Sequence, residues 1–122
     1  MSRVLTVAAV AALLATAAVA LASVSGPYTG RSSAGRMSFS ISKDGRYVTN
    51  FRFVNACPTD SVKGNLVPGR MKIGARGQFH HYDEQFKVIG RFTASGAQGV
   101  ARNDTGDCHS GVLHWTARPL HD

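Results

Sequence analysis

The chain has 122 residues, of which 43% are hydrophobic and 17% charged, a balance typical of a globular domain rather than of a disordered, fibrous or coiled-coil chain. Its 14 Lys and Arg against 7 Asp and Glu give a formal charge of +7. These totals favour one domain and exclude a large multidomain enzyme, but they identify no activity.

The N-terminal segment is typical of a secretory signal peptide. Residues 4–22 form an uncharged, alanine-rich run that follows Arg3 and ends in a small-x-small triplet at Ala22. A retained membrane anchor is the alternative, because the run is nearly as long as a spanning helix. An alanine-rich run gains little from lipid, however, and no basic cluster follows it. We predict a signal peptide over 1–22 and a single secreted domain over 23–122, with no membrane attachment after cleavage.

The chain after the leader alternates with a period of two. Met37, Phe39 and Ile41 alternate with serines and predict a half-buried strand. Asp44-Gly45 then predicts a type I′ hairpin turn, which needs positive φ at both central residues. The next strand is expected to place four residues on one face and two on the other: Tyr47, Thr49, Phe51 and Phe53, against Asn50 and Arg52.

A loop and further strands are expected in the second half. Residues 58–70 hold two prolines and two glycines and are predicted to be a long loop. Another alternation starts at Met71 and is extended past Gly77 to His81. A strand from Phe86 to Ala94 follows. The remaining residues predict a tight turn at Ser95-Gly96, a weaker strand over 97–102 and a turn over 103–107. A closing strand is predicted over 112–118, with Leu113, Trp115 and Ala117 pointing inward.

The fold class predicted from these patterns is all-β. No window of 11 or more residues after the leader is patterned as an amphipathic helix. We expect an antiparallel meander of six to eight short strands closed into a small barrel, with a two-layer β-sandwich as the alternative. Large inward side chains favour a filled interior: Phe39, Phe51, Phe53, Phe86, Phe92 and Trp115.

The two cysteines predict one disulfide. Cys57 and Cys108 are an even count in a chain with an export signal. A bridge between them would close the loop that runs from Cys57 to Cys108, and the chain-entropy model gives a loop of that length a stabilisation of about 4 kcal/mol. Two buried free thiols are the alternative, and the absence of a Cys-x-x-Cys spacing argues against a catalytic dithiol.

Several segments together resemble a known group of proteins. They are a Tyr-x-Gly start at Tyr28, the alternating stretches 37–42 and 48–53, and a Cys-x-Ser-Gly-x-x-x-Trp ending from Cys108 to Trp115. In these features the chain resembles a family of small uncharacterised secreted proteins of actinobacterial type, over most of residues 26–118. The resemblance implies an all-β exported domain and no activity, cofactor or catalytic residue.

Catalytic and metal-binding interpretations find little support. Asp107, His109 and Ser110 superficially suggest a triad, but neighbours on one strand or turn diverge, and no Gly-x-Ser-x-Gly elbow is present. His80 and His81 are adjacent and would point to opposite faces of a strand. His109 or His114 could approach them only across strands, in a register that the sequence does not specify. We therefore expect that the protein is not an enzyme, that it has no catalytic residue, and that it binds no metal and no other cofactor.

A run of unopposed cations indicates an anionic partner. Lys63, Arg70, Lys72 and Arg76 occur with no acid between residues 61 and 82. Outside the cell such a surface would favour an anionic envelope polymer or another protein, rather than nucleic acid. General solubility explains the same charge equally well.

The expected function is therefore that of a secreted, monomeric, non-enzymatic binding or interaction protein of the cell envelope or medium. The alternatives are a barrel that binds a small apolar ligand, and an inhibitor of a secreted enzyme that uses the loop over 58–70.

Overall fold

The computed structural model describes residues 24–54, 65–105 and 108–120. These ranges contain ten strands and no helix, which confirms the all-β prediction. The strands are β1 (Gly26–Ser32), β2 (Gly35–Ile41), β3 (Tyr47–Phe53), β4 (Asn65–Leu66), β5 (Arg70–Lys72), β6 (Gln78–Tyr82), β7 (Phe86–Phe92), β8 (Ala97–Thr105), β9 (Cys108–His109) and β10 (Leu113–Pro119).

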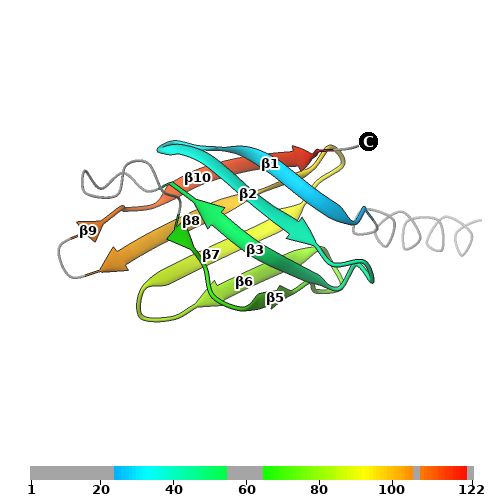
Figure 1. Cartoon of the computed structure of the whole chain (residues 1–122), viewed down its shortest axis with the longest axis horizontal. Helices are drawn as coiled ribbons and strands as arrows, with labels where there is room; N and C mark the ends of the chain where they lie inside the picture. Colours follow the sequence, from blue (N-terminus) through cyan, green and yellow to red (C-terminus); the bar gives the residue numbers. More distant parts are fainter. Residues whose placement is uncertain (1–23, 55–64, 106–107, 121–122) are drawn as a thin grey trace, which may run out of the picture.

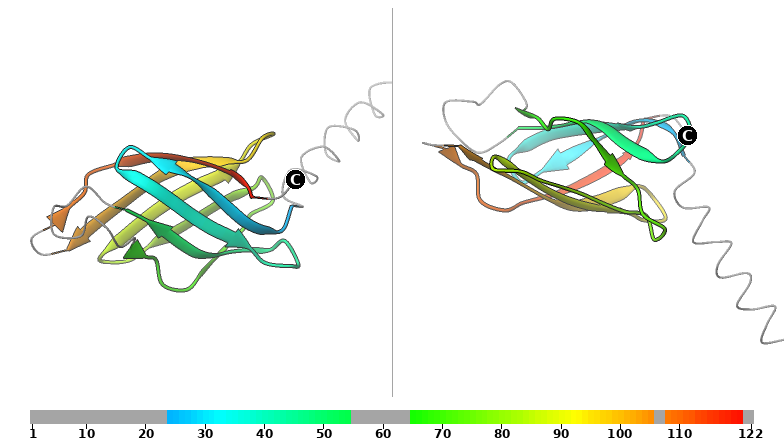
Figure 2. Two further views of the ribbon diagram at one scale, coloured as in Figure 1. Left: turned by 45° about the horizontal axis from the view of Figure 1, so that its top comes forward. Right: turned by 90° about the horizontal axis from the view of Figure 1, so that it is seen from below.

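The strands form one antiparallel sheet that curls into a half-barrel, as Figure 1 and Figure 2 show. The order is β4-β3-β2-β1-β10-β8-β7-β6, with β5 on β3 and β9 on β8. Two meanders, β1 to β4 and β6 to β8, are joined because β10 lies between β1 and β8. Leu120 extends this junction by donating its N–H to the carbonyl of Pro27 at 2.9 Å. A single continuous sheet favours the barrel over the sandwich.

Two details differ from the predicted barrel. The ladder ends at β4 on one side and at β6 on the other, so the closure is partial. The described strands exceed the expected six to eight because β4, β5 and β9 have only two or three residues each. Segments that short are too brief to show an alternation in the sequence.

Alternation predicted the inward faces of three long strands correctly. In β2, β7 and β10 every second residue is buried, including Phe39, Val88 and Trp115. The prediction holds because successive side chains of a strand point to opposite faces of the sheet. The outward residues of these strands are correspondingly exposed or half-buried.

β3 breaks its alternation at Asn50. Asn50 has a φ of 53°, a left-handed conformation that asparagine tolerates better than most residues. Ser38 of β2 lies opposite Arg52, and Ser40 lies opposite Thr49. Over this interval β2 advances by two residues and β3 by three, so β3 contains a β-bulge.

The bulge moves different residues into the core from those expected. Val48 is fully buried, and Phe51 and Phe53 are buried after the bulge. Tyr47 and Thr49 are only half-buried, so the prediction that they share the inward face of Phe51 was wrong. The extra residue shifts the side-chain alternation by one, which a strict period of two cannot anticipate.

The hairpin between β2 and β3 also differs from its prediction. Gly45 has a positive φ of 74° but Asp44 does not, so the turn is not of type I′. The Gly45 N–H donates to the carbonyl of Ser42 at 2.9 Å. The carboxylate of Asp44 accepts hydrogen bonds from the Ser42 hydroxyl and the Arg46 N–H. These bonds, that from Ser42 first, hold the pKa of Asp44 below its ordinary value.

Three boundaries in the second half need correction. The alternation from Met71 to His81 belongs to two strands, separated by a turn in which the Gly77 N–H donates to the carbonyl of Gly74. The loop predicted over 58–70 contains β4, and its residues 58–64 lie outside the described residues. The turn predicted over 103–107 is occupied up to Thr105 by β8, because pairing with β7 and β9 continues the strand.

An interlocked set of aromatic rings fills the inside of the half-barrel. Phe39 is at its centre, stacked on Tyr28 with ring centroids 4.9 Å apart. It also contacts four further rings: Phe51, Phe79, Phe92 and Trp115. The six large aromatics that were predicted to fill the interior are all buried, and burial also raises the pKa of Tyr28. The concave side of the sheet is therefore a packed core.

Candidate binding surface

The outward side chains of β6, β7, β8 and β10 form two parallel rows across the strands. Strand pairing places one polar residue of each strand side by side in the first row: Gln78, Arg91, Gln98 and Thr116. The second row has an apolar centre with a histidine at each end: His80, Ile89, Val100 and His114. The rows are two residues apart along each strand, about 6.8 Å.

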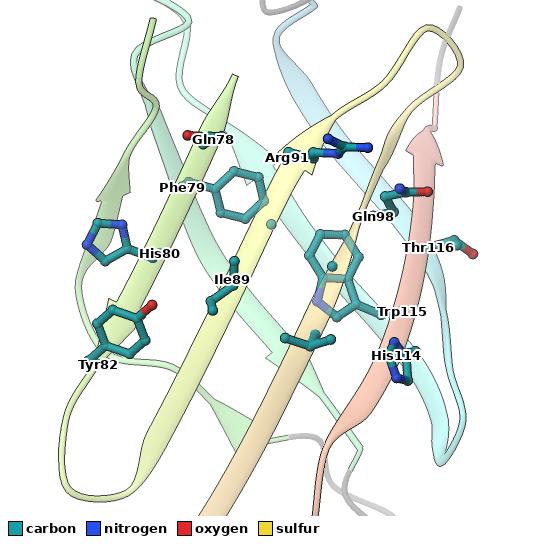
Figure 3. A pocket seen from close by; sticks show the side chains of 13 residues that line it. Gln78, Phe79, His80, Tyr82, Ile89, Arg91, Gln98, His114, Trp115 and Thr116 are labelled. Atoms are coloured by element: carbon teal, nitrogen blue, oxygen red, sulfur yellow. The ribbon is translucent and has the colours of Figure 1, made fainter. Parts of the chain in front are cut away.

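These rows line a hollow on the outer face, which we call the central hollow (Figure 3). Its volume is about 640 Å³. Gly90 and Gly99 lie between the two rows and opposite each other in the β7–β8 ladder. Their missing side chains let Phe79 and Trp115 pack directly beneath this part of the sheet. The buried rings of Phe79 and Trp115 therefore lie directly beneath the backbone at the centre of the hollow.

One end of the central hollow is aromatic and basic. The rings of His80 and Tyr82 lie with centroids 5.1 Å apart, and the Tyr82 side chain is exposed. The Lys87 ammonium lies 5.5 Å from the centroid of the Tyr82 ring. Figure 3 shows His80 and Tyr82 side by side along β6. This end offers a flat ring surface next to a positive charge.

A second hollow of about 370 Å³, the side hollow, continues the first. It shares Gln98 and Thr116 with the central hollow, and it reaches across β10 to β1. Its other polar side chains are two arginines and three hydroxyl groups: Arg31, Arg118, Thr29, Thr93 and Ser95. We call the two hollows together the binding track, which crosses five neighbouring strands from β6 to β1.

The binding track is positively charged. It contains Arg31, Arg91 and Arg118, and none of its lining residues is acidic. Within the described ranges, none of these three arginines forms an ion pair with a carboxylate; the pairs there are Arg102–Asp104, His81–Asp83 and His109–Asp104. The acids described lie in turns or near the end of a strand: Asp44, Asp83, Glu84 and Asp104. The middle of the outer face therefore carries positive charge that no neighbouring lining residue offsets.

The cations singled out in the sequence lie elsewhere. Arg70 and Lys72 are exposed on β5, and Arg76 is exposed in the turn that follows. The Arg70 guanidinium lies 3.8 Å above the centroid of the Tyr47 ring. Lys63 lies outside the described residues. An anionic-partner surface on these four residues remains a prediction, separate from the binding track.

Two of the three residues that suggested a triad, His109 and Ser110, have structural partners. The Ser110 hydroxyl accepts a hydrogen bond from the Asn103 N–H at 2.9 Å and donates one to the Gly111 carbonyl at 2.8 Å. His109 pairs through Nδ1 with Asp104 at 3.1 Å, while Asp107 lies outside the described residues. The hydroxyl of Ser110 thus serves the turn between β9 and β10.

The cysteines and histidines are placed as follows. Cys108 is in β9, no free cysteine occurs in the described ranges, and Cys57 lies outside them, so the predicted bridge stays a prediction. His80 and His114 share a row but are three strands apart, about 14 Å. The part of the chain that is described holds no group of three or more residues suited to binding a metal ion.

The alternation in β7 and β10 implies outward positions for Arg91, Thr116 and Arg118 but does not indicate that they lie together. The alternation shows only that each points away from the core. Their proximity depends on β10 lying between β8 and β1, a pairing of residues distant in the chain.

In comparisons with known proteins, no family model, no curated protein and no solved structure matched the chain. In the ranges described, no helix has the length and apolar character needed to cross a membrane.

Proposed function

We propose that this protein is an exported, non-enzymatic binding protein whose outer face holds an anionic partner of the cell envelope or medium. The observation that carries the proposal is the binding track, in which Arg31, Arg91 and Arg118 face solvent without an acid beside them. A guanidinium is always charged and presents a planar fork of donors, which suits carboxylate and phosphate groups. Export rests on the leader over 1–22.

The packed interior supports an outer site over the alternative of an apolar-ligand barrel. Phe51 and Phe53 are 1% exposed, and Phe39 is in contact with five other rings. A ligand on the concave side would have to displace this ring cluster. The inhibitor alternative rests on a loop over 58–70 that is mostly outside the described residues.

Salt-dependent binding to anionic polymers tests the proposal. Three variants lose equal charge: Arg31→Gln/Arg91→Gln/Arg118→Gln in the track, Arg70→Gln/Lys72→Gln/Arg76→Gln on the surface first predicted, and the control Lys43→Gln/Arg46→Gln/Arg52→Gln. We expect the track variant to bind about ten- to a hundredfold more weakly and with a smaller salt dependence. The control should bind nearly as the wild type does.

Each outcome of this comparison has a definite meaning. Equal losses in all variants would show that binding follows net charge rather than the track. A loss confined to the Arg70, Lys72 and Arg76 variant would move the site to β5 and its following turn. If no variant affects binding, the outer face is not the contact surface.

A further inference from the structure

The centre of the binding track is apolar although its surroundings are charged and polar. Ile89 lies directly opposite Val100 in the β7–β8 ladder, and Ile89 is 40% exposed. Single exposed apolar residues are ordinary on protein surfaces. Here two β-branched side chains lie together at the base of a hollow, between His80 and His114. A polymer that offers only charge would gain nothing from this contact, whereas a ligand with an apolar ring face would bury it.

The polar row beside this apolar pair can both donate and accept hydrogen bonds. Gln98 lies between Arg91 and Thr116, and Gln78 lies on the other side of Arg91. Amide and hydroxyl side chains each present donors and acceptors, which is what a ligand rich in hydroxyl groups requires. The guanidinium between the two amides adds a site for a carboxylate.

The two rows are separated by about 6.8 Å, a distance that one six-membered ring with its substituents bridges. A sugar ring can therefore lie with its C–H face on Ile89 and Val100 while its substituents reach Arg91 and Gln98. The side hollow repeats the polar part of this arrangement with Arg31, Arg118 and neighbouring hydroxyl groups. Successive sugar units of one polymer would therefore lie first beside Arg91 and then beside Arg31 and Arg118 along the track.

From this arrangement we infer that the binding track holds an acidic polysaccharide, a chain of sugars that carry carboxylates, laid across β6, β7, β8, β10 and β1. The inference rests on the proposed function and narrows it to one class of polymer. The four steps between these strands span about 19 Å, so the track accepts several linked units rather than a single sugar. A polyphosphate has no apolar ring face to place on Ile89 and Val100, and a neutral glycan has no carboxylate to pair with the arginines.

Titration of the full chain with four probes tests the inference. The probes are an oligogalacturonate long enough to span the track, an inorganic polyphosphate of equal charge, a neutral oligosaccharide of equal length and a single-stranded oligonucleotide. The diagnostic variant is Ile89→Thr/Val100→Thr, which keeps β-branched side chains on the strands. Leu66→Thr/Val112→Thr is the matched control, since both residues are exposed and neither lines the hollows.

We expect the oligogalacturonate to bind most tightly, and Ile89→Thr/Val100→Thr to weaken it about tenfold while polyphosphate binding stays unchanged. Polyphosphate or oligonucleotide binding tighter than that of the oligogalacturonate, or oligogalacturonate binding that the double variant does not affect, would overturn the sugar assignment and leave the proposed function intact. Failure of every anionic probe to bind would overturn both. Circular dichroism of each variant verifies that the fold is retained.

Discussion

Gly90 lies directly opposite Gly99 in the β7–β8 ladder, and the indole of Trp115 packs against both. A Cβ built on Gly90 would lie 2.7 Å from Cζ2 of Trp115 and 2.6 Å from a ring carbon of Phe79. Separations this short do not occur for real Cβ atoms. The glycine pair is therefore what allows two large rings to lie beneath the central hollow.

Gly90→Ala is expected to destabilise the protein by about 1–3 kcal/mol, because the new methyl group overpacks the core. Urea unfolding measures the change. Gly74→Ala is the matched control: its Cβ would meet only the Gln78 carbonyl, at 3.4 Å, an ordinary contact. The control should be neutral or slightly stabilising. Equal stability of the Gly90→Ala variant and the wild type would contradict the packing described above.

The bulge at Asn50 predicts an unusual response to substitution. Asn50→Gly should leave stability unchanged or raise it slightly, because glycine adopts positive φ without steric cost. Asn50→Val should cost about 1–2 kcal/mol although the site is exposed, since a β-branched residue is strained there. Arg52→Val, at an exposed position on the same strand, is the control for general effects of valine. If urea unfolding shows the Asn50→Val variant to be as stable as the Arg52→Val variant, the bulge is not present as described.

The central position of Phe39 predicts a large cost for its removal. Phe39→Ala should lower the free energy of unfolding by about 3–5 kcal/mol, because five ring contacts are lost and a cavity is left. Phe39→Leu should cost less and keeps the measurement possible if the alanine variant does not fold. Thermal and urea unfolding give both values. A cost below about 1 kcal/mol for either variant would contradict a ring cluster centred on Phe39.

Asp83 predicts a dependence of stability on pH. Its carboxylate accepts hydrogen bonds from His81 Nε2 at 2.5 Å and from the N–H groups of Phe86 and Gln85 at 2.7 Å. These bonds, the one from His81 first, lower the pKa of Asp83. The pKa of an aspartic acid in an unfolded chain is about 3.9. A carboxyl whose pKa is lower in the folded state stabilises the fold at a pH above that unfolded-state pKa, and this stabilisation is lost as the pH falls through the folded-state pKa.

Asp83→Asn should therefore destabilise the protein at neutral pH, and the difference from wild type should shrink as the pH falls below about 4. Urea midpoints measured across this range give the result. Glu84→Gln is the control, because the described structure shows no hydrogen bond to that side chain. A difference that stays constant with pH would exclude a role for the Asp83 charge.

The leader and the cysteines predict a specific mass for the exported protein. Cleavage after Ala22 should give a chain that starts at Ser23, and a Cys57–Cys108 bridge should make it lighter by two hydrogen atoms than the reduced form. Intact mass before and after reduction, on protein from the culture medium, measures both. A retained leader would restore the membrane-anchor alternative, and two alkylatable thiols without prior reduction would exclude the bridge.

The sequence by itself determined the fold class and most inward faces. In β2, β7 and β10, burial depends only on which face of a strand a residue occupies, and that has a period of two wherever the backbone is regular. The alternation of Phe39 and Trp115 with polar neighbours is therefore visible without any knowledge of the partner strands.

Only the tertiary structure decided the bulge and the binding track. The bulge at Asn50 depends on how β3 pairs with β2, because the extra residue exists only relative to a partner strand. Arg91 and Arg31 are 60 residues apart in the chain, and they join one surface because β8, β10 and β1 are neighbours in the sheet. Strand order and register depend on pairing between residues that are distant in the chain, and a local pattern of side chains does not indicate which strands pair.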